Sequence, residues 1–321
     1  MFRLLLPQAP PLPKVYILNE ALVKATKEVK KFYLLGKNRD NNPCEASMYI
    51  LAVLVQRPGI FKSPFELLEL SEIESVIVTH VVYPADKFKD NKPGYAGFKA
   101  PKGYTANRMN MIFREMLLTY INRYPLIDLL GNIHSHTFIK ADSMSGGDNQ
   151  DSKRSMARFK RSGLNTRFKF LMSPNSNSGE DWGIYGFAYQ NGNPRRLSGL
   201  EVISRNHSLF KAAIEKPCYY SSDFTQWAKQ QCYALEVEFG LKLRWEQIVR
   251  GWSTLDVLNL NGKEISICFP PFFPESPIKV YYFNGKKYIA LNTEGFNWKG
   301  DNEQLRNLKL TELIKIVKEK T

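Results

Sequence analysis

The stretch from residue 126 to residue 151, LIDLLGNIHSHTFIKADSMSGGDNQD, constrains the fold of this chain more than any other. Its apolar beginning favours a buried strand, and the strand delivers His134 and His136 at its end. Side chains two positions apart on a strand point to the same face, so the two imidazoles can aim at one point. The stretch therefore predicts a strand end that is able to bind a metal ion.

Asp148 lies in the loop that follows and would complete a set of two histidines and one carboxylate. Such a set leaves one tetrahedral position of a zinc ion open for water, whose pKa the ion lowers toward about 7. Hydrolysis would also need a general base, an Asp or Glu from a neighbouring element, and a hydrogen-bond donor for the oxyanion. Ser145, three residues before Asp148, is placed to be that donor. Paired histidines at a strand end can also simply cap or pack, but the Ser-x-x-Asp pattern favours a metal site.

The charge balance favours acidic partners. The chain carries 45 Lys and Arg against 31 Asp and Glu, a net charge of +14. Nucleic acid, an anionic membrane or an acidic protein face would each fit. Nucleic acid is not favoured, because the sequence has no helix-turn-helix, zinc-finger or RNP-type motif. The longest apolar run, YILAVLV at 49–55, is far shorter than the roughly 20 residues of a spanning helix, so no membrane association is expected.

The cysteines and the first residues favour a cytoplasmic protein. Cys44, Cys218, Cys232 and Cys268 are scattered and form no C-x-x-C pair, which suits reduced thiols better than disulfides or a cysteine-rich zinc site. The first residues, MFRLLLPQAPPLPK, are broken by prolines and lack the cleavage site of a signal peptide.

Residues 1–205 alternate between expected strands and helices, which predicts an α/β domain. Asn19 is expected to cap a helix that stops at Gly36. The other expected strands cover 14–18, 47–55, 75–83, 168–173 and 182–203, and the other expected helices cover 107–124 and 149–163.

Residues 206–321 predict a second, α+β domain. A helix is expected between a cap at Ser221 or Ser222 and a stop at Gly240. The segment 264–283 predicts a strand, a proline-rich turn and a second strand, and residues 307–320 predict an amphipathic helix.

The motif HSHTFIKADSMSGGD resembles that of the JAMM (also JAB or MPN) metalloproteases, which have His-x-His, a loop, Ser-x-x-Asp and a glutamate far upstream. The segment NPCEASMYILAVL resembles the family's glutamate-led strand, and DWGIYGFAYQNG resembles a late strand. The resemblance covers about residues 14–200 and implies a JAB/MPN-type mixed sheet flanked by helices. It makes Glu45 the matching general base, and it matches His134, His136 and Asp148 to the zinc ligands.

The spacing departs from the family pattern at one point. Eleven residues, 137–147, separate His136 from Asp148, where the family usually has ten. The extra residue falls before Ser145, in a loop, and loops absorb single insertions at little cost. Asp142 and Asp151 stay open as alternatives for the third ligand.

The resemblance implies a zinc-dependent peptidase or isopeptidase that cuts after the C-terminal glycine of a ubiquitin-like protein, for precursor processing or deconjugation. The implied partners are that ubiquitin-like protein and its conjugates. The basic, glycine-rich segment 84–103 could clamp an extended peptide tail, although a solvated surface loop is the simpler interpretation.

The segment ISICFPPFFPESPIKVYYF faintly resembles the strand, proline turn and strand of ubiquitin-conjugating enzymes and their inactive RWD relatives. A thioester cysteine would have to lie after the proline turn, and no cysteine follows Cys268. The resemblance therefore implies a domain that binds a partner without carrying ubiquitin, and an unrelated α+β domain is the alternative. The combination suggests a bacterial or phage ubiquitin-like system, with its conjugation enzymes as further partners.

Two other functions compete with the zinc peptidase. A catalytically silent MPN-type scaffold would bind a ubiquitin-like or acidic protein partner, and the extra loop residue is its main support. An amidohydrolase also begins with His-x-His on a strand, but it needs further histidines, and only His80 and His207 remain, on segments that look unrelated.

Overall fold

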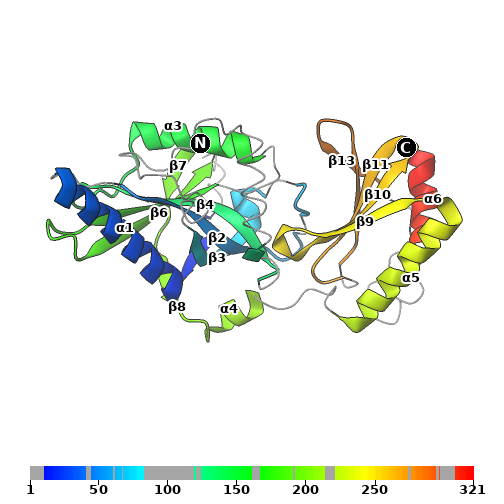
Figure 1. The fold of residues 1–321 in the computed structure, drawn as a ribbon, viewed down its shortest axis with the longest axis horizontal. Helices are drawn as coiled ribbons and strands as arrows, with labels where there is room; N and C mark the ends of the chain where they lie inside the picture. Colours follow the sequence, from blue (N-terminus) through cyan, green and yellow to red (C-terminus); the bar gives the residue numbers. More distant parts are fainter. Residues whose placement is uncertain are drawn as a thin grey trace, which may run out of the picture. The chain divides into compact units, whose positions relative to one another are not determined.

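The computed structural model describes residues 11–40, 45–60, 62–66, 68–82, 119–120, 124–160, 167–190, 192–213, 221–273, 276–293, 296 and 308–321. These residues form two compact units (Figure 1). The described residues within 1–60, 67–116 and 128–213 form the N-terminal unit, and those within 61–66, 117–127 and 214–321 form the C-terminal unit.

The N-terminal unit is built on an eight-stranded mixed sheet with the order β7-β6-β5-β4-β2-β3-β1-β8. β1 pairs in parallel with β3 and β8, and β4 pairs in parallel with β5, whereas the β2–β3, β5–β6 and β6–β7 pairs are antiparallel. This confirms the mixed α/β class. The strands are β1 (Lys14–Leu18), β2 (Ser47–Gln56), β3 (Ile73–Val82), β4 (Ile127–Ser135), β5 (Phe168–Pro174), β6 (Trp182–Gln190), β7 (Asn193–Arg196) and β8 (Leu200–Ile203).

The middle strands of this sheet are apolar on both faces. Leu51, Ala52 and Val53 on β2 and Ile77 on β3 are all almost fully buried. Continuous apolar runs of this kind are expected where both faces of a strand are covered. The expected strands at 47–55 and 75–83 are thus confirmed to within two residues.

Helices cover both faces of the sheet. α1 (Asn19–Asp40) packs on one face, where Tyr33 meets Trp182 of β6 edge to face with 5.5 Å between ring centroids. α3 (Gly146–Lys160) lies on the opposite side of the strands (Figure 1). The described part of the unit also contains the short helix α4 (Ser208–Ala213) and the 3-10 turn η1 (Leu70–Glu72).

The expected stop of the first helix at Gly36 is wrong, because α1 continues through Gly36 to Asp40. A glycine inside a helix costs only about 1 kcal/mol relative to alanine. The face that holds the helix in place is formed by Ala25, Val29 and Phe32, which are buried. Packing of this face therefore outweighs the local signal of the glycine.

Several expectations lie outside the described residues. These are the segment 84–103, Gly163 and most of the helix expected at 107–124, of which residues 119 and 120 are described as helical and residue 124 as non-helical. No helix in the described part of the chain is long and apolar enough to cross a membrane.

The described part of the C-terminal unit contains a five-stranded antiparallel sheet with the order β13-β12-β11-β10-β9, and the helices α5 and α6 pack with it. Side chains of both helices and of the sheet share one apolar core, which includes Trp227, Ile267, Phe269 and Ile314. The elements are α5 (Ser222–Phe239), β9 (Lys242–Gln247), η4 (Val249–Gly251), β10 (Ser253–Leu260), β11 (Lys263–Phe269), β12 (Lys279–Phe283), β13 (Tyr288–Leu291) and α6 (Leu310–Lys320).

The ends of α5 follow the sequence expectation. Ser221 is the N-cap, and its hydroxyl accepts a hydrogen bond from the backbone of Phe224 at 3.1 Å. Gly240 ends the helix in the left-handed conformation with φ of 64°.

A short segment that follows β2 in the chain belongs to the C-terminal unit. Phe65 stacks on Tyr288 with 4.1 Å between ring centroids. The Glu66 carboxylate accepts hydrogen bonds from the Tyr281 hydroxyl at 2.8 Å and from Lys279 Nζ at 2.7 Å. The Ser63 and Tyr281 hydroxyls are 2.6 Å apart. The C-terminal unit is therefore discontinuous in the sequence, because it contains described residues of 61–66 and 117–127 as well as of 214–321.

Glu66 makes the stability of the C-terminal unit sensitive to acid. Burial opposes its charge, but hydrogen bonds from Lys279, the Ser63 backbone and Tyr281 outweigh burial and lower its pKa. A lowered carboxyl pKa stabilises the fold above the unfolded value of about 4.3, and this stabilisation is lost as the pH falls through the folded value.

We predict that Glu66→Gln costs about 1–2 kcal/mol of unfolding free energy at pH 7, because a charge-assisted hydrogen-bond centre is removed. The difference from wild type should shrink as the pH falls below about 4. Urea unfolding, monitored by tryptophan fluorescence, measures this difference in unfolding free energy. The exposed Glu319→Gln is the control. A cost that does not change with pH would contradict the role of the Glu66 charge.

Candidate metal centre

Strand β4 lies between β5 and β2 in the N-terminal sheet and brings the two histidines to its C-terminal end. His134 is paired in register with Leu171 of β5, and the His136 backbone donates to the Met172 carbonyl at 2.8 Å. The second histidine is therefore fixed to the sheet although the strand proper ends at Ser135. Both histidines are 8% exposed. The expected placement on one face of a strand end agrees with the close approach of their rings.

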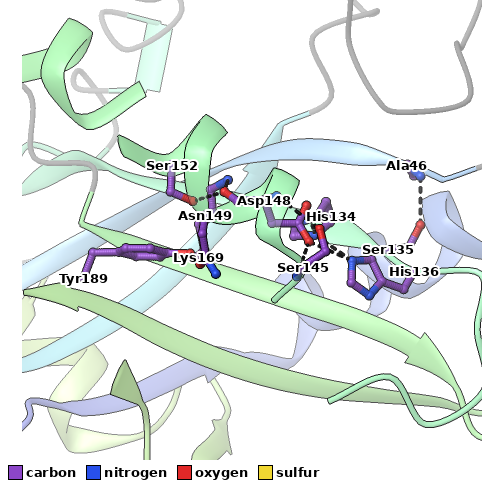
Figure 2. A network of polar contacts seen from close by, with 10 residues as sticks. All are labelled: Ala46, His134, Ser135, His136, Ser145, Asp148, Asn149, Ser152, Lys169 and Tyr189. Atoms are coloured by element: carbon purple, nitrogen blue, oxygen red, sulfur yellow. Dashed lines mark hydrogen bonds and ion pairs between the residues drawn. The ribbon is translucent and has the colours of Figure 1, made fainter. Parts of the chain in front are cut away.

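Donor atoms of three residues converge at this point (Figure 2). His134 Nε2 lies 3.3 Å from His136 Nε2. The two nitrogens lie 3.2 Å and 3.1 Å from the two carboxylate oxygens of Asp148. Among the described residues, these three form the group of histidine and acidic side chains that is close enough to hold a metal ion.

Hydrogen bonds alone cannot satisfy all three contacts. A neutral imidazole nitrogen that donates to the carboxylate has no lone pair left for the other nitrogen. A cation between the three side chains would satisfy them together. Zinc bonds to nitrogen and carboxylate oxygen are roughly 2.0–2.2 Å long, which places tetrahedral donor atoms about 3.3 Å apart. The observed distances fit that requirement, so the three residues could bind a metal ion.

Asp148 is held by the start of α3. The Ser145 hydroxyl accepts from the Asp148 backbone at 3.1 Å, and the Ser145 backbone donates to the Asp148 carboxylate at 2.8 Å. The backbone of Asn149 donates to the Ser145 carbonyl at 3.1 Å and so begins the helix. This reciprocal arrangement is a capping box. The Ser-x-x-Asp pattern thus orients the carboxylate, and the hydroxyl hydrogen of Ser145 is not used by the capping bond.

The electrostatics of the three residues suit a cation. Burial opposes the charge of Asp148, but hydrogen bonds from both histidines and Ser145 outweigh it and hold the pKa of Asp148 well below its usual range. Burial lowers the pKa of His134, which favours the neutral imidazole that a metal requires. The hydrogen bond to Asp148 raises the pKa of His136, so at low pH a proton competes with a metal ion for this imidazole.

Glu45 lies beside this group. The backbone of its neighbour Ala46 donates to the Ser135 hydroxyl at 2.8 Å, and the Ser135 backbone donates to the Ala46 carbonyl at 2.9 Å. Burial raises the pKa of Glu45, His136 lowers it and Asp148 raises it further. A carboxylate with a raised pKa that senses the charges of two ligand residues is suited to accept a proton.

The other candidates lie elsewhere. Asp142 forms an ion pair with Arg196 at 2.8 Å, and the side chain of Asp151 is outside the described residues. His80 makes a 3.0 Å hydrogen bond with Thr79, and the ring of His207 lies beside Tyr16. Neither histidine belongs to the group around Asp148.

The sequence interpretation missed one residue of this site, Lys169. It is 5% exposed, and its Nζ donates to the main-chain carbonyl of Asp148 at 3.3 Å. The available signal was a lysine inside the otherwise apolar strand FKFLM. A charged residue is almost never buried without a partner, so a lysine in this strand predicts a polar partner beside it.

Comparisons with known proteins assign no family. No family model and no curated protein matches the chain. Among solved structures, the chain is similar to the solution structure of protein DSY2949 from Desulfitobacterium hafniense. The two share 13% identity with a TM-score of 0.31, over 60% of this chain and 97% of that one.

We predict that the purified protein binds a divalent metal ion at one site per chain, and that His134→Ala and Asp148→Ala each abolish binding. Loss of one of three ligands removes the convergent arrangement described above. Elemental analysis of protein purified without chelators measures the metal content of each variant. Asp142→Asn is the control and should retain the ion. Full metal content in both alanine variants would place the ion elsewhere.

Proposed function

We propose that the N-terminal unit is a zinc-dependent peptidase or isopeptidase of the JAB/MPN type. The observation that carries the proposal is the convergence of His134, His136 and Asp148, with Glu45 near enough for the charges of His136 and Asp148 to shift its pKa. The order of these residues in the sequence and the motif around them resemble that family. The proposed substrate is a ubiquitin-like protein, cut after its C-terminal glycine.

The chain's own residues divide the work of hydrolysis. His134, His136 and Asp148 would hold zinc, which when bound acidifies water and polarises a carbonyl oxygen. Glu45 takes the proton from the attacking water and later passes it to the leaving amine, because its raised pKa suits both steps. The Ser145 hydroxyl donates a hydrogen bond to the oxyanion.

The C-terminal unit is proposed to bind a protein of the same ubiquitin-like system. A helix followed by an antiparallel meander, with the proline-rich turn between β11 and β12, supports the likeness to ubiquitin-conjugating and RWD domains. Cys268 is fully buried, and burial raises its thiol pKa well above the ordinary value. Such a thiol is unsuited to carry a thioester, which supports a binding role without catalysis.

A silent scaffold is the second candidate, and one observation favours it. The Ser145–Asp148 capping box stabilises the start of α3 whether or not a metal is bound. Half of the motif therefore has a purely structural use. The convergence of two histidines on the same carboxylate has no such use, and for that reason we place the zinc peptidase first.

We predict that Glu45→Gln lowers kcat about 100- to 10,000-fold while the metal content stays at the wild-type level, because a general base is removed and no ligand is changed. A panel of ubiquitin-like proteins with a fluorogenic amide on the C-terminal glycine provides the assay. The exposed Glu74→Gln is the matched control. Activity that survives in Glu45→Gln would exclude Glu45 as the base, and activity that survives chelation would exclude zinc hydrolysis.

Ser145 can be separated from its capping role by two substitutions. Glycine is nearly as good an N-cap as serine, whereas alanine costs about 0.5–2 kcal/mol. We predict that Ser145→Gly and Ser145→Ala both lose about 100- to 1,000-fold in kcat, because both lack the oxyanion donor. Only Ser145→Ala should lower the melting temperature clearly. Wild-type kcat in Ser145→Gly would show that the hydroxyl acts through the helix cap alone.

A further inference from the structure

Lys169 is a buried cation in the middle of a buried strand. Its neighbours Phe168 and Phe170 on β5 are 0% and 1% exposed, and Lys169 itself is 5% exposed. Taking an ammonium group out of water is costly, and an apolar side chain of similar volume would often be as stable or more stable at such a position. The stability of the sheet alone therefore gives no reason for a lysine here.

The sheet register places Lys169 on the face of the metal centre. It is paired with Asn132 on the parallel strand β4, two residues before His134. Paired residues of parallel strands share a face, and residues two apart on one strand share it as well. Lys169 therefore lies on the side of the sheet that carries His134, beneath the start of α3.

The ammonium group reaches the first turn of α3 (Figure 2). Its Nζ donates to the main-chain carbonyl of Asp148 at 3.3 Å. The same carbonyl accepts a 2.5 Å bond from the Ser152 hydroxyl, but that bond stays inside the helix. One residue further on, the Asn149 side chain accepts from the Tyr189 hydroxyl of β6 at 2.9 Å. Lys169 and Tyr189 thus tie the first turn of the helix to two strands of the sheet.

This attachment matters because helix ends fray, and Asp148 lies in the first turn. Its carboxylate must stay within 3.1–3.2 Å of two imidazoles that are fixed to the sheet. The capping box fixes the carboxylate relative to the helix only. A bond from the sheet to the backbone of Asp148 fixes the helix turn relative to the histidines.

We propose that Lys169 is a positioning residue of the metal centre, which holds the Asp148 carboxylate against His134 and His136 through the Asp148 main chain. The inference rests on the proposed metal site. A buried cation near a divalent ion also repels it, so the two effects of Lys169 on metal affinity have opposite signs. We place the positional effect first, because the Lys169 Nζ donates to the main chain of the ligand residue itself.

Zinc affinity tests the proposal. Each metal-free protein is titrated with zinc against a chromophoric chelator, and its melting temperature is measured separately. Lys169→Met should bind zinc about 10- to 100-fold more weakly than wild type, in the range seen for residues that orient metal ligands. Its metal-free melting temperature should equal or exceed that of wild type, because a buried charge has been removed.

Three further variants complete the experiment. Lys169→Arg retains the charge and a donor and should lie closer to wild type than Lys169→Met. Lys153→Met, which removes an exposed lysine of α3, should leave the zinc affinity unchanged. Tyr189→Phe, which breaks the second tie without changing charge, should weaken zinc binding and decides the matter if Lys169→Met does not fold.

Equal or tighter zinc binding by folded Lys169→Met would overturn the positioning role, as would unchanged binding by Tyr189→Phe if Lys169→Met does not fold. Absence of zinc binding by the wild type is a different result, because it would overturn the metal site itself.

Discussion

The carboxylate of Asp148 belongs to two structures at once. It closes the capping box that starts α3, and its two oxygens face the imidazoles at the end of β4. The first role needs only local sequence, since Ser145 is three residues away. The second role brings a helix end and a strand end together around three polar groups that hydrogen bonds alone cannot satisfy. Both buried histidines contact this carboxylate, and the buried Lys169 donates to the main-chain carbonyl of the same residue.

Local pattern predicted the parts of this site that lie close together in the chain. Alternation on a strand placed His134 and His136 on one face, and the short spacing to Asp148 brought in the carboxylate. Glu45 could be chosen only through a family resemblance, because the bonds that place it join Ala46 to Ser135 across 89 positions. Lys169 was missed because it acts through a hydrogen bond to a backbone carbonyl on another element. No residue pattern encodes such a contact directly.

The fold shows the same limit. Caps and periodicity predicted α5 correctly, with Ser221 and Gly240 at its ends. They failed at Gly36, where packing of one helix face outweighs a local stop signal. They also gave no sign that the segment with Phe65 and Glu66 belongs to the C-terminal unit, since its reason is a stack on Tyr288 and hydrogen bonds to Tyr281 and Lys279. Contacts between residues far apart in the sequence determine which unit such a segment joins, and a single sequence does not reveal those contacts.

The central claim is that two histidines and one aspartate hold zinc with a position left for water. X-ray absorption at the zinc edge of the loaded protein measures the ligands directly. The account predicts two imidazole nitrogens and oxygen ligands at about 2.0–2.2 Å, with no sulfur, and loss of this spectrum in His134→Ala. A sulfur ligand, or the same spectrum in wild type and His134→Ala, would contradict the account, because the zinc would then lie away from the end of β4.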